Sequence, residues 1–238
     1  EIPEAGRQAR GTALVNLVQI EPGERVTAVI PVKDFNDEAF LIFATANGIA
    51  KKTSLAEYDT NRKGGIIGIS LDAGDELIGV RLTDGRQDTI LVTLHGQSIR
   101  CPEEQVRPVG RASRGVKGID LAPGDRVVGM EVVREGADLL VITENGFGKR
   151  TPLEGYRVQT RGGKGTKTLR ITKKNGMIAG ARVVTEDNGL MVVTAEGIII
   201  RTKVKDISSM GRDTQGVRII RLDENDRDRK STRLNSSH

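Results

Sequence analysis

The sequence is poor in residues that cross-link chains or stack on bases. Its 238 residues include one cysteine, two histidines, four phenylalanines, two tyrosines and no tryptophan. The single cysteine, Cys101, excludes an intramolecular disulfide, and the scarcity of Cys and His excludes the usual zinc spacings. Six aromatic residues cannot supply a base-stacking platform along the whole chain. These absences predict a reducing, cytoplasmic setting and disfavour a protein that binds single-stranded nucleic acid.

Long apolar runs are also missing. No run approaches the roughly 18 residues that a membrane span needs. The first residues, EIPEAGRQAR, contain neither a signal-peptide core nor an initiator methionine. We therefore expect a soluble fragment without a membrane partner. Glycine, in contrast, is abundant: its 29 residues are about 12% of the chain against a usual level of about 7%, which predicts many turns.

Internal repetition dominates what is present. Four segments share an apolar run, a threonine, two further residues, a glycine and a basic end: FLIFATANGIAKKT from Phe40, TILVTLHGQSIRCP from Thr89, LLVITENGFGKRTP from Leu139 and LMVVTAEGIIIRT from Leu190. Their turn glycines are Gly48, Gly96, Gly146 and Gly197, which are 48, 50 and 51 residues apart. A second, glycine-basic element keeps the same phase around Gly65, Gly115, Gly165 and Gly216. Two markers in phase establish a repeat of about 50 residues.

Each repeat contains about four short β-branched runs separated by Gly, Asn or Asp, and little helical periodicity. This pattern predicts an all-β, propeller-like array of four-stranded blades, truncated at both ends. The Asn-Gly pairs at 47–48 and 145–146 predict type I′ hairpin turns. The expected boundaries are the end of a preceding blade at 1–19, blades at 20–71, 72–121, 122–171 and 172–222, and the start of a truncated blade at 223–238. Because the pattern fails after about Arg227, we expect the remaining tail to be foreign and disordered.

Charge is segregated within the repeat. The windows 48–68, 96–119, 146–170 and 197–221 hold 22 basic and 7 acidic residues, whereas the rest of the chain holds 15 basic and 25 acidic ones. Corresponding strands of a propeller-like array lie at the same radius, so this segregation predicts a basic rim. Such a rim suits a bent polyanion, and duplex DNA or RNA fits better than single strands. The alternative is that these cations only solvate outer strands and discourage edge pairing.

The densest glycine-basic loop, Gln159-Thr160-Arg161-Gly162-Gly163-Lys164-Gly165, lies in the third complete repeat and continues to Lys167. Its glycines allow close backbone approach to a phosphate, while Arg161 and Lys164 supply charge. A tight turn between blades is the structural alternative. The loop resembles the Q-[RK]-R-G-G-[RK]-G box of the DNA gyrase A C-terminal domain, and residues 1 to about 227 resemble that domain throughout. Thr160 departs from the box, where the family usually has a basic residue.

The resemblance implies a β-pinwheel whose basic perimeter wraps double-stranded DNA and presents it for strand passage. It further implies a cytoplasmic, nucleoid-associated parent, an ATP-hydrolysing DNA topoisomerase in which the gyrase A and gyrase B proteins form a heterotetramer. On this interpretation ATP and magnesium belong to other regions of the parent, and we expect no cofactor, metal site or catalytic tyrosine in this segment. The family's principal box lies in a first blade that this segment is expected to lack, so the present loop is interpreted as a degenerate, later copy.

The predicted DNA-contacting residues are the basic and glycine residues of these periodic windows: Gln159, Arg161, Gly162, Gly163, Lys164, Gly165, Lys167, Lys149, Arg150, Arg62, Lys63, Arg111, Arg114, Lys117, Arg201, Lys203, Arg212 and Arg218. Tyr58 and Tyr156 each precede a glycine-basic loop and are predicted to be packing residues. Three other interpretations stay open: the homologous domain of topoisomerase IV, a propeller scaffold for acidic protein partners and, least favoured, a propeller hydrolase.

Overall fold

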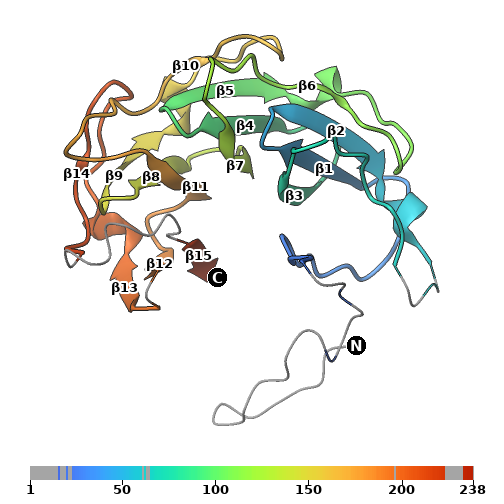
Figure 1. Cartoon of the computed structure of the whole chain (residues 1–238), viewed down its shortest axis with the longest axis horizontal. Helices are drawn as coiled ribbons and strands as arrows, with labels where there is room; N and C mark the ends of the chain where they lie inside the picture. Colours follow the sequence, from blue (N-terminus) through green and yellow to red (C-terminus); the bar gives the residue numbers. More distant parts are fainter. Residues whose placement is uncertain are drawn as a thin grey trace.

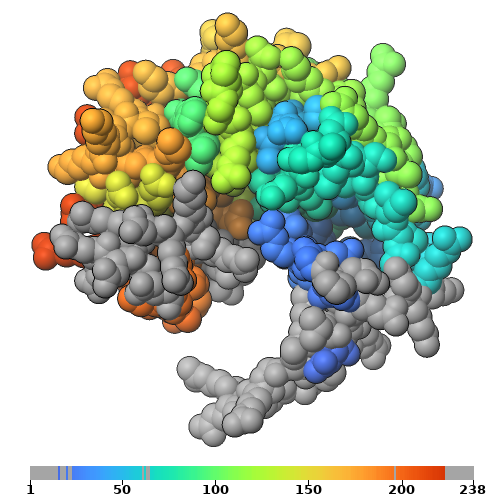
Figure 2. Space-filling model, in the orientation of Figure 1, coloured from blue at the N-terminus to red at the C-terminus, as the bar shows by residue number. Residues whose placement is uncertain are grey.

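The chain forms an open arc of β-sheets in the computed structural model (Figure 1). The structure describes residues 16, 20, 23–60, 62, 65–195 and 197–222, together with the backbone of 233–237. In the space-filling view residues 23–60, 65–195 and 197–222 follow one another around the arc (Figure 2). The predicted end of a preceding blade at 1–19 lies almost entirely outside the described residues.

Three sheets have four strands and a fourth sheet has three. In the first, the order is β3 (Leu77–Thr83), β1 (Phe40–Thr45), β2 (Ile49–Ser54) and β6 (Val116–Lys117). In the second it is β7 (Val127–Val132), β4 (Asp88–Thr93), β5 (Gln97–Pro102) and β10 (Thr166–Lys167). In the third it is β11 (Ile178–Val184), β8 (Asp138–Thr143), β9 (Phe147–Pro152) and β14 (Val217–Arg218). The fourth contains β15 (Arg233–Ser237), β12 (Gly189–Val193) and β13 (Ile199–Lys203).

Short 3-10 helices follow the second strand of each hairpin, and the paired strands are antiparallel. These helices are η2 (Leu55–Tyr58), η3 (Glu103–Gln105), η4 (Leu153–Gly155) and η5 (Val204–Asp206). The strands β3, β7 and β11 lie on the inner side of the arc, and β6, β10 and β14 lie on its outer side (Figure 1). The predicted all-β repeat of four-stranded units is therefore confirmed for three sheets.

The sheets are out of phase with the sequence repeat. Each four-stranded sheet takes its inner and its outermost strand from the repeat that follows its hairpin. The chain reaches β6, for example, only after it has completed β5, and on the way Pro108 bridges Lys52 of β2. The predicted boundaries at 71/72, 121/122 and 171/172 each fall inside a sheet. A periodic sequence fixes the repeat length, but it contains no mark that says which strands pair.

The recurring threonine and glycine make the same hydrogen bonds in each hairpin. In the first hairpin the Gly48 N–H donates to the Thr45 carbonyl at 3.0 Å, and the Thr45 hydroxyl accepts the Ile49 N–H at 3.2 Å. Thr93, Thr143 and Thr194 accept the same bond in their hairpins. Gly48 has a φ of +79°, but among the described residues only glycines have positive φ. The predicted type I′ turns are therefore wrong: the turn asparagines stay at negative φ, and the following glycine alone adopts the left-handed conformation.

Apolar side chains from neighbouring sheets form the core. Between the first and second sheets, Ile42, Leu91 and Met130 belong to one buried cluster. A second cluster joins the second and third sheets, and a third cluster joins the third and fourth. On the inner side, the carboxylate of Glu131 in β7 binds the guanidinium groups of Arg81 in β3 and Arg182 in β11, each at 2.6 Å. Apolar packing between sheets and this inner ionic contact fix the curvature that orients the outer edge.

The tail differs from its predicted state. We expected disorder after about Arg227, yet Arg233–Ser237 forms β15 and pairs with β12, from Val193 opposite Arg233 to Gly189 opposite Ser237. β15 stands where β11 stands in the third sheet. The physical reason is the hydrogen-bonding edge of β12, which would otherwise present unpaired N–H and C=O groups.

Candidate nucleic-acid interface

The glycine-basic segments form the outer edge of the arc because β6, β10 and β14 are the outermost strands of their sheets. A glycine precedes each of these strands by one residue. At Gly165 φ is +75°, and a Cβ atom there would lie 2.4 Å from the Ser98 carbonyl oxygen. Gly115 and Gly216 have the same conformation and a similarly close carbonyl. Glycine is needed at this position because the backbone of one repeat runs directly against the preceding hairpin.

Backbone hydrogen bonds join these segments from one repeat to the next. The three bonds recur with the period of the sequence: Ser70 N–H to Ser113 O at 3.2 Å, Asp120 N–H to Gly163 O at 2.9 Å and Arg170 N–H to Thr214 O at 2.9 Å. A further bond runs from the Gly162 N–H to the Gly118 carbonyl at 2.7 Å. The segments therefore form a continuous curved edge, which is the arrangement that the periodic charge predicted.

Eight of the predicted contact residues are exposed on or beside this edge: Arg62, Arg114, Lys117, Lys164, Lys167, Arg201, Lys203 and Arg218. Some have an acidic neighbour. Arg114 pairs with Asp72 at 2.5 Å, and Lys117 pairs with Asp120 at 2.9 Å. Hydrogen bonding to Lys117 lowers the pKa of Asp120. Such exposed pairs are weak and can exchange a carboxylate for a phosphate. The predicted residue Lys63 lies outside the described part of the chain.

Lys149 cannot contact a ligand, so the prediction that it contacts DNA is wrong. Its side chain is completely buried, and its ammonium donates to the carbonyls of Gly211 and Arg212, the latter at 2.6 Å. Lys51 is buried in the same way and donates to the Gly68 carbonyl at 2.6 Å and to the Arg111 carbonyl. Burial lowers the pKa of each lysine to about 8. Both ammonium groups hold the beginning of a glycine-basic segment from beneath.

Arg150 is also bound within the protein. Its guanidinium binds the carboxylates of Asp138 and Glu186, each at 2.7 Å, and donates to the Ile207 carbonyl at 2.8 Å. Hydrogen bonding to Asp138 is the main reason that the pKa of Arg150 is raised. With 12% of its side chain exposed, Arg150 has little surface left for a phosphate. The prediction that it contacts DNA was therefore wrong as well.

Within the box-like loop, Arg161 acts mainly as a brace. Its guanidinium donates to the Gln105 carbonyl at 2.9 Å and to the Lys117 carbonyl at 3.1 Å, and its N–H donates to the Gln105 side chain at 2.8 Å. Gln159 is half-buried, and its Nε2 is the one buried side-chain N or O atom without a hydrogen-bond partner among the described residues. Lys164 is the exposed cation of this loop. The loop thus presents fewer free charges than its sequence suggests.

The two remaining predicted arginines, Arg111 and Arg212, are intermediate in exposure. Arg111 donates through Nη1 to the Ile67 carbonyl at 3.1 Å, and Arg212 donates through Nη1 to the Lys167 carbonyl at 3.5 Å. Both side chains are half-buried. Because a guanidinium has five N–H donors, each arginine can brace the edge and contact a ligand at once.

The two tyrosines, whose hydroxyl groups could in principle react, are hydrogen-bonded within the protein. The Tyr156 hydroxyl is buried against the Thr168 hydroxyl, and the Tyr58 hydroxyl donates to the Gly68 carbonyl at 3.2 Å. Burial raises the pKa of both phenols. The described residues contain no group of three or more His, Cys, Asp or Glu side chains suited to hold a metal. In the same part of the chain, no helix is long and apolar enough to cross a membrane.

Lys173 and Lys174, which line one pocket together with Phe147, were not among the predicted contacts. The sequence could have indicated them, because the turn that contains Lys173 and Lys174 is basic, whereas the corresponding turns of the two preceding repeats are acidic.

Fold and edge together define a propeller-like β-array with a cationic, glycine-rich outer curve. The profile of the DNA gyrase C-terminal domain, a β-propeller family, matches residues 1–33, 39–84, 87–134, 137–185 and 190–227. The chain therefore belongs to the DNA gyrase A C-terminal domain family.

Curated relatives agree with this assignment. The chain is 58% identical over 224 residues to the A subunit of DNA gyrase from Halalkalibacterium halodurans and 48% identical over 221 residues to that from Clostridium acetobutylicum. These matches cover 94% and 93% of this chain but 27% of each relative, so the chain spans about a quarter of their length.

Solved structures share the fold. The C-terminal domain of DNA topoisomerase IV superposes with a TM-score of 0.86 at 31% identity, covering 94% of this chain and 70% of that one. A DNA gyrase A C-terminal domain superposes with a TM-score of 0.82 at 26% identity, covering 91% and 73%.

Proposed function

We propose that this domain binds duplex DNA along its outer edge and bends it, as the DNA-wrapping part of DNA gyrase A, a component of a type IIA topoisomerase. The observation that carries the proposal is the set of periodic hydrogen bonds that join the glycine-basic segments into one convex curve. A straight duplex touches a convex edge at one repeat only. Contact with several repeats therefore requires a bent duplex, whose bending energy, of order 1–6 kcal/mol for 20–30 base pairs, is offset by phosphate contacts.

The proposal extends to the parent protein. The bent segment would be presented for strand passage, and handed wrapping would favour negative supercoiling. This parent would be a cytoplasmic, nucleoid-associated heterotetramer with gyrase B. ATP hydrolysis and magnesium binding would belong to other regions of it. The residues of this chain contribute positioning: exposed lysines and arginines meet phosphates, and buried Lys51 and Lys149 keep the loops in place. A topology assay on the intact parent distinguishes negative supercoiling, expected for gyrase, from relaxation or decatenation alone, expected for topoisomerase IV.

The direct test changes exposed cations of the edge. We expect Arg62→Gln with Lys164→Gln to weaken duplex binding and to lower the slope of log K against log salt by about 2, since each phosphate contact contributes about 0.9. The control is Arg86→Gln with Arg134→Gln, two exposed arginines in turns outside the basic windows, which removes the same charge. Equal slopes for the two variants would reject the edge as the binding surface. Salt-insensitive binding of an acidic protein, without DNA affinity, would favour the scaffold alternative.

A further inference from the structure

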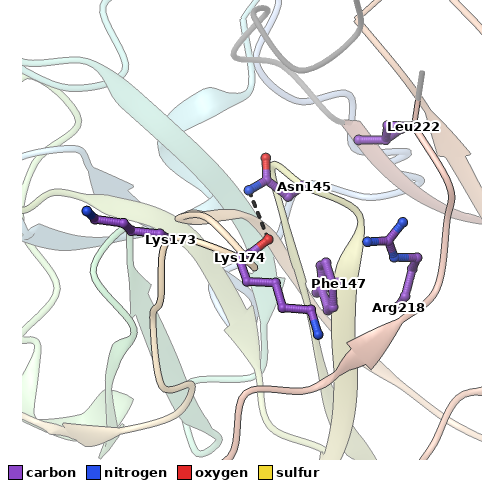
Figure 3. A pocket seen from close by; sticks show the side chains of 6 residues that line it. All are labelled: Asn145, Phe147, Lys173, Lys174, Arg218 and Leu222. Atoms are coloured by element: carbon purple, nitrogen blue, oxygen red, sulfur yellow. Dashed lines mark hydrogen bonds between the residues drawn. The ribbon is translucent and has the colours of Figure 1, made fainter. Parts of the chain in front are cut away.

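A cationic pocket lies where the third hairpin, the turn before β11 and the outer strand β14 meet (Figure 3). It has a volume of about 230 Å³. Its lining consists of Asn145, Phe147, Lys173, Lys174, Arg218 and Leu222. The three cations come from two segments that are more than forty residues apart, so the pocket exists only in the folded arc.

Phe147 organises two of these charges. The Lys174 ammonium lies 5.7 Å from the centroid of its ring, and the Arg218 guanidinium carbon lies 5.1 Å from it. In Figure 3 the two side chains flank the ring, whereas Lys173 extends away from it. The Asn145 amide donates to the Lys174 carbonyl at 3.1 Å and ties the turn to the hairpin. Cation–π contact holds both cations beside the same ring without neutralising either charge.

Neither cation has a carboxylate partner in the described part of the chain. This separates the pocket from the corresponding positions elsewhere on the edge. Lys117 and Lys167, which occupy the place of Arg218 in the two preceding repeats, have Asp120 and Asp213 as ion-pair partners. Two like charges beside one partly apolar wall are electrostatically unfavourable unless an anion is bound between them.

The adjacent turn has reversed its charge. In the first two repeats an aspartate of this turn accepts the N–H of the hairpin residue, Asp75 from Asn47 and Asp125 from His95, both at 2.9 Å. The third repeat has Thr-Lys-Lys-Asn-Gly at 172–176, without an acidic residue. The hairpin there contributes its own carboxylate, from Glu144, which accepts the Met177 N–H at 3.1 Å. The exchange moves the carboxylate from the turn to the hairpin and adds two positive charges to the turn.

We propose that Lys174 and Arg218, held against Phe147, bind a phosphate of the duplex backbone. This inference rests on the proposed function and assigns it a specific anchor. The pocket fixes a phosphate at the junction of the outer edge and the hairpin turns, so the duplex that follows the edge is held at this repeat more firmly than at the first two. Lys173 adds positive potential at longer range.

The experiment measures duplex DNA binding against salt concentration for this chain and for Lys174→Gln with Arg218→Gln. We expect about tenfold weaker binding at about 0.1 M salt and a slope lower by about 1, from one lost phosphate. The Arg86→Gln, Arg134→Gln variant is the charge-matched control and should keep the wild-type slope. Both substituted side chains are exposed, and thermal unfolding verifies that the variants fold.

The outcomes separate this inference from the proposed function. If wild type binds duplex DNA and Lys174→Gln with Arg218→Gln keeps its slope, the pocket is not an anchor and the proposed function stands. If wild type binds no duplex, the proposed function fails. A titration with inorganic phosphate, followed by the NMR signal of the Asn145 amide, distinguishes a free anion: saturation there together with an unchanged DNA slope overturns the assignment to the DNA backbone.

Discussion

The two buried lysines give the chain a measurable pH signature. In the Lys149→Met variant the ammonium that holds the Gly211 and Arg212 carbonyls is lost. Methionine fits the site because the corresponding residue of the second sheet, Ile99, is apolar and buried. In wild type, burial lowers the pKa of Lys149 from 10.5 to about 8, so between these values the unfolded chain binds more protons than the folded one. Linkage then makes wild-type stability rise with pH in this window.

The magnitude follows from the same pKa. Between about pH 7 and pH 9 the folded lysine loses most of its proton while the unfolded lysine keeps it. The free energy of unfolding of wild type relative to Lys149→Met should increase by about 1 kcal/mol over this interval. Taking the difference between two proteins cancels the titration of the buried tyrosines and of Cys101, whose raised pKa values act in the opposite direction.

Urea unfolding at about pH 7 and pH 9, followed by circular dichroism, measures this difference. Lys164→Met is the matched control, because Lys164 is exposed and its substitution should shift stability equally at both pH values. An equal difference between wild type and Lys149→Met at the two pH values would refute the assignment of Lys149 as a buried, charged brace.

Two further predictions concern stability. Glu131→Gln should lower the free energy of unfolding by about 2 kcal/mol, because the carboxylate charge that Arg81 and Arg182 share is lost; urea unfolding checks this against exposed Glu135→Gln, and equal effects would contradict it. Gly165→Ala should cost about 2 kcal/mol or more, because its φ is +75° and the added Cβ would lie 2.4 Å from the Ser98 carbonyl. Gly211→Ala is the control, since nothing lies within 4 Å of its Cβ position, and an equal shift in melting temperature would show that close approach is not the cause.

Much of the architecture was predictable because it is local. The spacing of Gly48, Gly96 and Gly146 specifies the repeat, and the preceding threonines specify where each hairpin turns. Strand pairing was not predictable in the same way. An outer strand such as β10 belongs to a hairpin more than sixty residues earlier, and pairing at that separation depends on packing between repeats, which composition does not encode.

The turns illustrate a finer limit. Asn-Gly is a strong hairpin signal, and hairpins do form at both pairs, but the turn type depends on the threonine side chain that accepts the N–H after the glycine. That bond favours a turn in which only glycine has positive φ. The residues around the dipeptide decided the geometry.

The cations of the periodic windows divide by function in a way that charge counting cannot detect. The position three residues after the hairpin glycine alternates between lysine and isoleucine, as Lys51, Ile99, Lys149 and Ile200.

Where it is lysine, in the first and third sheets, the ammonium holds the next glycine-basic segment from beneath. Where it is Ile99, the side chain has no hydrogen-bond donor, and Arg161 ties the corresponding segment to the Gln105 and Lys117 carbonyls. Arg161 therefore braces its loop without help from a buried lysine, whereas the equivalent Arg111 and Arg212 bonds are made in addition to one. It follows that binding strength along the edge depends on the exposed cations, such as Lys164, and that neutralising a brace should lower affinity by loosening a loop without removing a phosphate contact.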